Sequence, residues 1–182
     1  MHRLALITAP AVEVLSLAEA KEHLRVDHDD EDTLIEALIG AATAWLDGWT
    51  GVLGMCLEAQ TWEMTLDRFP AREFCIPLGP VVSVDAITYV DSDDVEQTLA
   101  GTEYEAAGAR VRPVDGWPST STNYDAVKVR FTAGTGTPEN IKHVVRLLIG
   151  HWYENRESVG DKMEAVPMAV DMLIAPIRRV RL

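Results

Sequence analysis

The sequence predicts an α+β fold in which a helical core carries an inserted antiparallel β unit. Apolar residues recur with helical spacing towards both ends of the chain, and they alternate with polar residues in between. The chain has 182 residues, 47% hydrophobic and 25% charged, which is the composition of a folded protein. We expect one domain with its helical core at about 12–56 and 137–176, the β-rich insertion at about 58–134 and a basic C-terminal tail at 177–182.

Two helices are expected before the insertion. Ser16 and Glu19 have the spacing of a capping box, so a short helix should run from about Leu17 to Arg25. The acidic stretch 27–32 supplies carboxylates that would cap the second helix and compensate its dipole. The second helix keeps helical spacing of its apolar residues as far as Trp49, and Gly51 is well placed to end it.

The insertion shows the period of two that is typical of strands. Apolar residues alternate with polar ones from Trp62 to Leu66, and again from Val127 to Thr132. Between Ala86 and Ile87 the apolar phase shifts, which predicts a bulge or burial on both faces. The expected strands lie at 62–66, 81–90, 95–99, around Tyr104, around Val111 and at 127–132, with a turn at 91–94.

Two further helices are expected after the insertion. Thr137 can cap the first of them and Pro138 suits its first position, and a broad apolar stripe follows as far as Tyr153. A last short helix should span about Met168 to Ala175. Together, the two pairs of helices would form the helical core.

Charge is distributed unevenly along the chain. The net charge is −13, which disfavours tight wrapping around DNA, because affinity for phosphates comes largely from Lys and Arg. Between Glu13 and Glu105 there are 21 acidic and 4 basic residues, whereas between Ala106 and Leu182 there are 8 acidic and 11 basic. This asymmetry suits head-to-tail contact with other chains or a ring with one acidic surface, and ordinary solvated faces are the alternative.

Nothing in the sequence indicates a membrane or a secreted protein. No stretch approaches the roughly 20 apolar residues of a spanning helix, and the run Leu4–Ile7 is too short for the apolar part of a secretion signal. Cys56 and Cys75 do not have the spacing of a zinc or thioredoxin-like motif. We expect a soluble, intracellular protein with two buried thiols, and pairing of the two cysteines in an oxidising setting is the alternative.

No familiar catalytic motif is present in the sequence. It has no nucleophile elbow, zinc-protease helix, phosphate loop or dinucleotide fingerprint, and the acidic stretch 27–32 lacks the glycine and final glutamate of a calcium loop. The pairs Glu19/His23 and His151/Glu154 each share a helix face, but a metal site of this kind needs further carboxylates. We therefore expect no enzyme activity, no cofactor and no metal.

The chain ends in a basic segment. Arg178, Arg179 and Arg181 alternate with Val180 and Leu182 beyond the last expected helix. Such a segment can bind a partner by strand addition or charge pairing, and a frayed terminus is the alternative. These five residues are the candidate partner interface.

Five segments stand out as sequence motifs. They are 14–26, 60–63, 129–134, 138–142 and 147–157, and the last two are the most specific. In these segments the chain resembles the head–tail connector proteins of long-tailed phages, whose relatives in prophages and gene transfer agents are called head–tail adaptors. The resemblance extends from about residue 12 to residue 176.

The resemblance implies a structural virion protein. Such proteins form a ring, typically of twelve copies, between the portal protein and the next neck or tail component, and DNA passes through the lumen without specific binding. The resemblance also implies that Arg178, Arg179 and Arg181 dock on the portal. The protein would be made in the bacterial host cytoplasm and would act at the head–tail joint of the virion, where an acidic lumen would let DNA slide.

Other functions stay open at this point. An acidic mimic of DNA that inhibits a DNA-processing enzyme would fit the net charge. A stopper or tail-completion protein of the same neck would share the virion context. An enzyme with an unrecognised site would depend on His23, His151 or Glu154 as its best candidates.

Overall fold

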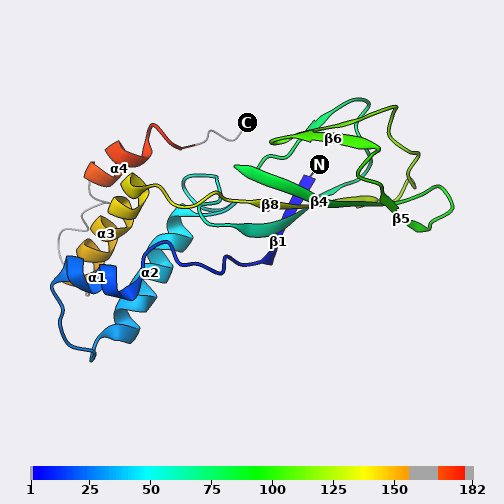
Figure 1. Cartoon of the computed structure of the whole chain (residues 1–182). Coiled ribbons are helices and arrows are strands. Elements are labelled where there is room, and N and C mark those ends of the chain that lie inside the picture. The colour runs from blue at the N-terminus through cyan, green and yellow to red at the C-terminus, as the bar shows by residue number, and fades with distance from the viewer. Residues whose placement is uncertain (1, 156–167, 179–182) are drawn as a thin grey trace. The chain divides into compact units, whose positions relative to one another are not determined.

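The computed structural model describes residues 2–155 and 168–178, and it has the predicted α+β fold (Figure 1). The chain forms two compact units. The helical unit comprises 13–57 and 136–182, and the β unit comprises 1–12 and 58–135. The chain therefore passes from one unit to the other three times.

The helical unit contains four helices around one apolar core. They are α1 (Leu17–Leu24), α2 (Asp32–Leu46), α3 (Glu139–Glu154) and α4 (Met168–Ile174). The buried side chains of α2, α3 and α4 recur every three or four residues, as helical packing requires. These buried residues are Ile35, Ile39, Ala42, Leu46, Ile141, Val144, Val145, Leu148, Ile149, Val170 and Ile174.

The end of α2 differs from the prediction. The helix stops at Leu46, because Asp47 takes an extended conformation and the chain turns back. The backbone N–H groups of Val52 and Leu53 then donate to the carbonyl oxygens of Trp45 and Leu46, which would otherwise lack partners. Gly51 lies in this turn, where a Cβ atom would be only 2.2 Å from the carbonyl oxygen of Asp47.

The starts of two helices also differ from the prediction. The N-cap of α2 is Glu31, which makes no side-chain capping hydrogen bond. The N-cap of α3 is Pro138 rather than Thr137, again without a side-chain capping bond. By contrast, the capping box of Ser16 and Glu19 at the start of α1 is present as predicted.

The β unit contains two antiparallel sheets. The five-stranded sheet has the order β1-β2-β8-β4-β5, and the three-stranded sheet has the order β3-β7-β6. The strands are β1 (His2–Thr8), β2 (Gln60–Leu66), β3 (Phe74–Cys75), β4 (Val81–Val90), β5 (Glu96–Leu99), β6 (Tyr104–Ala107), β7 (Arg110–Pro113) and β8 (Val127–Ala133).

One face of the five-stranded sheet is apolar and the other is polar. Met64 of β2 lies opposite Val129 of β8, and both are buried. Thr65 lies opposite the exposed Lys128 on the other face. The register of β4 against β8 shifts between Val84 and Ala86, which confirms a bulge close to the predicted position, and shifts again between Val81 and Ser83.

Two features of the β unit were not expected. Strand β1 forms an edge of the sheet by pairing with β2. The sequence predicts no strand there and indicates only that the run is too short for a secretion signal. Its apolar run, Leu4–Ile7, lacks the alternation that identifies a strand. The expectation of two buried thiols was wrong, since Cys56 is buried but Cys75, in the two-residue strand β3, is exposed.

Candidate interaction surfaces

The last described helix presents an apolar surface to solvent. Val170 and Ile174 of α4 are buried in the core of the helical unit, whereas Met168 and Met172 are 79% and 72% exposed. These two methionines are four residues apart and therefore share one face of the helix. Exposed methionines are flexible, apolar side chains that suit contact with a partner protein.

The predicted partner interface begins directly after this helix. The side chain of Arg178 is exposed, and its backbone N–H donates to the carbonyl oxygen of Ile174 at 2.9 Å. Of the five predicted interface residues, Arg178 is the one that the structure places. Arg179, Val180, Arg181 and Leu182 lie outside the described residues.

Sequence reasoning missed the exposed face of α4. The available signal was the order of residues along the chain, in which the exposed Met168 and Met172 alternate with the buried Val170 and Ile174. A seven-residue helix is too short for periodicity alone to separate its two faces.

An ion-pair network joins α1 to α3 within the helical unit. Glu19 accepts hydrogen bonds from the backbone N–H of Ser16 at 3.0 Å and from its hydroxyl at 2.7 Å. Arg146 lies 3.3 Å and Lys142 4.0 Å from the same carboxyl group. The Ser16 hydrogen bonds, aided by these two cations, hold the pKa of Glu19 below its ordinary value.

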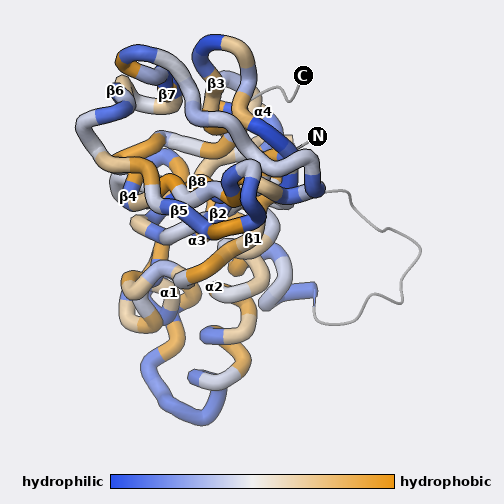
Figure 2. Tube along the Cα trace, turned by 90° about the vertical axis from the view of Figure 1, so that its right-hand side faces the viewer, coloured by the Kyte–Doolittle hydropathy of each residue, from blue (hydrophilic) through white to orange (hydrophobic). Residues whose placement is uncertain are grey.

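The acidic stretch before α2 is engaged mainly with one lysine. Lys21 of α1 lies 2.7 Å from a carboxyl oxygen of Asp29 and 2.7 Å from one of Asp32. These hydrogen bonds raise the pKa of Lys21 and lower that of Asp29. The stretch is coloured as strongly hydrophilic in Figure 2, and its role is to tie α1 to α2 and to present carboxylates to solvent.

One member of each helical pair considered as metal ligands is placed in another interaction. Glu19 is committed to Ser16, Lys142 and Arg146, as described above. His151 of α3 lies 3.4 Å from the amide nitrogen of Asn155. In residues 2–155 and 168–178, no three His, Cys, Asp or Glu side chains gather as a metal site would require.

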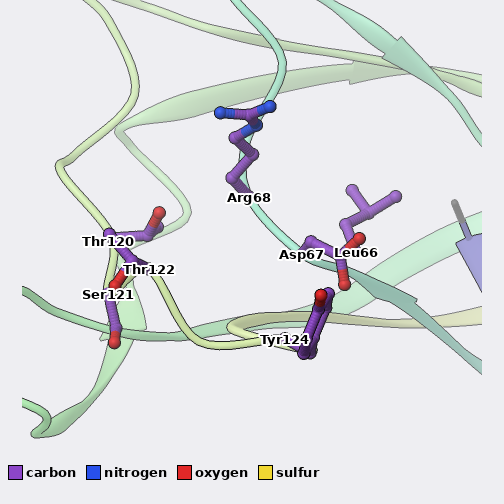
Figure 3. Close-up of a pocket in the computed structure, with 7 residues that line it drawn as sticks. All are labelled: Leu66, Asp67, Arg68, Thr120, Ser121, Thr122 and Tyr124. Carbon is purple, nitrogen blue, oxygen red and sulfur yellow. The ribbon is translucent and has the colours of Figure 1, made fainter.

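A hollow of about 510 Å³ opens at one end of the five-stranded sheet (Figure 3). Leu66, Asp67 and Arg68 line one side, and the other side is lined by Thr120, Ser121, Thr122 and Tyr124. The aromatic ring of Tyr124 is at its rim and this residue is 88% exposed. Hydroxyl groups, one carboxyl group and one guanidinium contribute polar atoms to a lining that is apolar in its larger part.

The loop that forms this hollow is held by hydrogen bonds. Ser121 donates its hydroxyl to Asp94 at 2.8 Å, and Asn123 donates its amide to the same carboxyl group at 3.0 Å. The backbone N–H of Asp125 donates to Asp67 at 3.2 Å, and Arg3 forms an ion pair with Asp125. These bonds fix the exposed side chains of the loop in place.

None of the helices in the described part of the chain has the length and apolarity needed to cross a membrane. The candidate surfaces are the exposed face of α4 with Arg178, the acidic stretch before α2, and the hollow at the end of the five-stranded sheet. The three come from separate elements of the chain.

Comparison with protein families gives a match over most of the chain. The model of the head completion protein family matches residues 13–164. This range contains α1, α2, α3 and all strands except β1. No curated protein matches the chain.

Comparison with solved structures gives matches over almost the whole chain. A chain in the neck of an empty GTA particle, computed with C6 symmetry, has a TM-score of 0.77 and 25% identity, covering 99% of this chain and 97% of that one. A chain in the virion of a native gene transfer agent (GTA) particle has a TM-score of 0.76 and 27% identity, covering 98% and 96%. A chain in the neck of a native GTA particle, computed with C12 symmetry, shares the fold with a TM-score of 0.71 and 24% identity, covering 99% and 97%.

Proposed function

The chain belongs to the head completion protein family, and from this premise we propose that it is a structural neck protein that joins head to tail. The observation that carries the proposal is the match of the family model to residues 13–164. The likeness to chains from a particle neck and a virion, over nearly the full length of both partners, supports the same role. The protein acts at the head–tail joint of a virion or gene transfer agent particle.

We further propose that the protein works as a ring, of twelve copies in the particle. The neck structures with C6 and C12 symmetry support a rotational arrangement of copies. A ring leaves a lumen through which DNA can pass, and the net charge of −13 keeps a polyanion from adhering to the protein. The function is mechanical and needs no catalytic group, metal or cofactor.

The partners on either side of the ring are the portal protein and the next neck or tail component. The candidate contact to the portal is the tail, Arg178, Arg179, Val180, Arg181 and Leu182, together with the exposed face of α4. The exposed Met168 and Met172 support this assignment, because they provide an apolar surface shortly before the basic tail in the chain. Apolar anchors beside charged groups are typical of protein interfaces.

Deletion of the gene from the strain that produces the particles tests the proposed role. We expect electron micrographs to show heads that are separated from complete tails, because the joint is missing. Restoring the gene on a plasmid should restore joined particles. Intact tailed particles from the deletion strain would overturn the proposal.

A charge-removal variant tests the portal contact. Replacing Arg178, Arg179 and Arg181 by Ala should reduce co-purification of the protein with the portal and should reduce the yield of joined particles. The matched control replaces Arg72, Arg110 and Lys128, three exposed cations of the β unit, and should retain both. Equal losses in the two variants would show that net charge, rather than the tail, is responsible.

A further inference from the structure

The two edges of the five-stranded sheet are unlike each other. Strand β1 forms one edge, and its outer side has no partner strand among the described residues. It is seven residues long, and Leu6 and Ile7 are 47% and 46% exposed. Proteins normally protect such an edge by charge, by proline or by shortness, because it can bind another strand.

An apolar hollow is lined in part by β2, the strand next to this edge. Met64, Leu66, Phe69 and Phe74 contribute to the lining of a hollow of about 620 Å³. Leu4 of β1 lies opposite Met64, so both point to the same face of the sheet. A strand added along β1 would place alternate side chains on this apolar face, next to Leu4 and Leu6.

The opposite edge is short and acidic. Strand β5 has four residues, and the turn that precedes it carries Asp91, Asp93 and Asp94. The carboxyl groups of Asp93 and Glu96 are exposed and have no ion pair among the described residues, whereas Asp91 accepts hydrogen bonds from Val95 and Gln97. This edge therefore offers backbone groups together with free negative charge.

The charges of the two edges lie at the same end of the sheet. The strand pairings form one continuous row across the five strands, which consists of His2, Leu66, Val127, Tyr89 and Gln97. The exposed Arg68 follows this row just beyond the end of β2, one strand in from the β1 edge, and Glu96 flanks the row in β5. A cation next to one edge strand and a carboxylate on the other edge strand thus lie at the same end of the sheet.

The directions of the two edge strands also agree. Each neighbouring pair in the five-stranded sheet is antiparallel, so β1 and β5 run in the same direction. Rotation about an axis along the strands preserves this direction. A rotationally symmetric ring also requires two different surfaces on each copy, one for each neighbour.

We propose that β1 of one copy pairs in parallel with β5 of the next copy, so that the five-stranded sheets form a continuous belt around the ring. The occupant of the β1 edge is a second copy of this chain, and the Arg68 and Glu96 side chains set the register between copies. This inference rests on the proposed ring in the neck and identifies the contact that closes it.

Cross-linking in assembled particles tests this contact. Ala5 of β1 and Thr98 of β5 are exposed and lie on the same, polar face of the sheet. In a Cys75→Ser background, the double variant Ala5→Cys, Thr98→Cys is expressed in place of the natural chain, and purified particles are treated with a short bismaleimide. We expect a ladder of multimers beyond the dimer on a denaturing gel.

Controls separate this contact from the proposed function. Each single cysteine variant can give no product larger than a dimer, and the variant Ala5→Cys, Lys128→Cys moves the second thiol from the edge to the exposed middle of the sheet. One outcome overturns the edge contact and leaves the neck role standing: the protein is present in the particles and its thiols react with a fluorescent maleimide, but no ladder forms. If the protein is missing from wild-type particles, the neck role itself is overturned.

A charge exchange tests the register. Arg68→Glu and Glu96→Arg should each reduce the ladder severalfold, because like charges then face each other between copies. The double exchange should restore it, because the opposite charges are paired again. Absence of rescue in a double variant that still enters particles would overturn the role of these two side chains.

Discussion

Ser16 and Glu19 fix the start of α1, because the side chain of each residue accepts a hydrogen bond from the backbone N–H of the other. The Ser16 hydroxyl accepts a hydrogen bond from the backbone N–H of Glu19 at 3.3 Å, and Glu19 accepts one from the backbone N–H of Ser16. The same carboxyl group binds Arg146 of α3. One local motif therefore also positions two helices that are distant in sequence.

Removing the capping hydroxyl should weaken the helical unit. We expect Ser16→Ala to lower the free energy of unfolding by about 1 kcal/mol, because a backbone donor of α1 loses its acceptor. Denaturation with urea, followed by circular dichroism, measures the change. Ser92→Ala, at an exposed turn position of the β unit, is the control and should change little; an equal loss in both would refute the capping argument.

Acid should also weaken the helical unit through Glu19. Its pKa is lowered in the folded state, so the charged carboxyl stabilises the fold at pH values above the ordinary pKa of glutamate. This stabilisation is lost as the pH falls from that value through the lowered pKa. Urea unfolding at a series of acidic pH values should show a smaller decline for Glu19→Gln than for the natural protein; equal declines would show that Glu19 contributes nothing.

At the scale of elements, the turn after α2 depends on a glycine. A Cβ atom at Gly51 would lie 2.2 Å from the carbonyl oxygen of Asp47, whereas one at Gly40, within α2, would meet nothing within 4 Å. We expect Gly51→Ala to destabilise the protein by about 1–3 kcal/mol through overpacking against backbone. Gly40→Ala should stabilise it by about 0.5–1 kcal/mol, because alanine favours the helix. Thermal denaturation of the two variants measures both, and a stable Gly51→Ala protein would contradict the close approach.

The elements with long and regular patterns could be predicted from the sequence. Helix α3 and strand β8 follow their apolar periods over whole elements, and both were confirmed within two residues. Strand β1 could not be predicted, because it exists only through pairing with β2, whose residues are more than fifty positions away. Short elements depend on such distant partners more than on their own sequence.

The candidate interface likewise has one part that could be predicted from the sequence and one part that could not. The basic tail could be identified from residue type alone, since Arg178, Arg179 and Arg181 follow a predicted helix end. The exposed face of α4 could not, because the sequence does not say which methionines the core has room for. Exposure of Met168 and Met172 is decided by the packing of Val170 and Ile174.

At the scale of the whole molecule, the surfaces divide between partners and copies. The exposed face of α4 and Arg178 belong to the helical unit, and the unlike sheet edges belong to the β unit. In the proposed neck, the helical unit would contact the portal while the β unit would contact neighbouring copies. Separate surfaces let the ring form without competing for the portal contact.

The isolated protein should be a monomer or weakly associated, and should assemble on the portal. Parallel pairing of one short strand with another gives few hydrogen bonds, and a template is needed to offset the entropy of association. Analytical ultracentrifugation should show the monomer mass, and hydrogen exchange should show an unprotected C-terminus that becomes protected when portal is added. A C-terminus fully protected in the free monomer would contradict this expectation.

Each unit has its own apolar core, so the two should unfold as separate transitions. The core of the helical unit includes the fully buried Leu148, and that of the β unit includes the buried Met64. Replacing either by alanine should cost about 2–5 kcal/mol in its own unit, through lost burial and a cavity. In differential scanning calorimetry, Leu148→Ala should lower the midpoint of one transition and Met64→Ala that of the other. If both variants lower the midpoint of one shared transition, the three chain connections couple the folding of the two units. The β unit would then not fold independently of the helical unit while it contacts neighbouring copies.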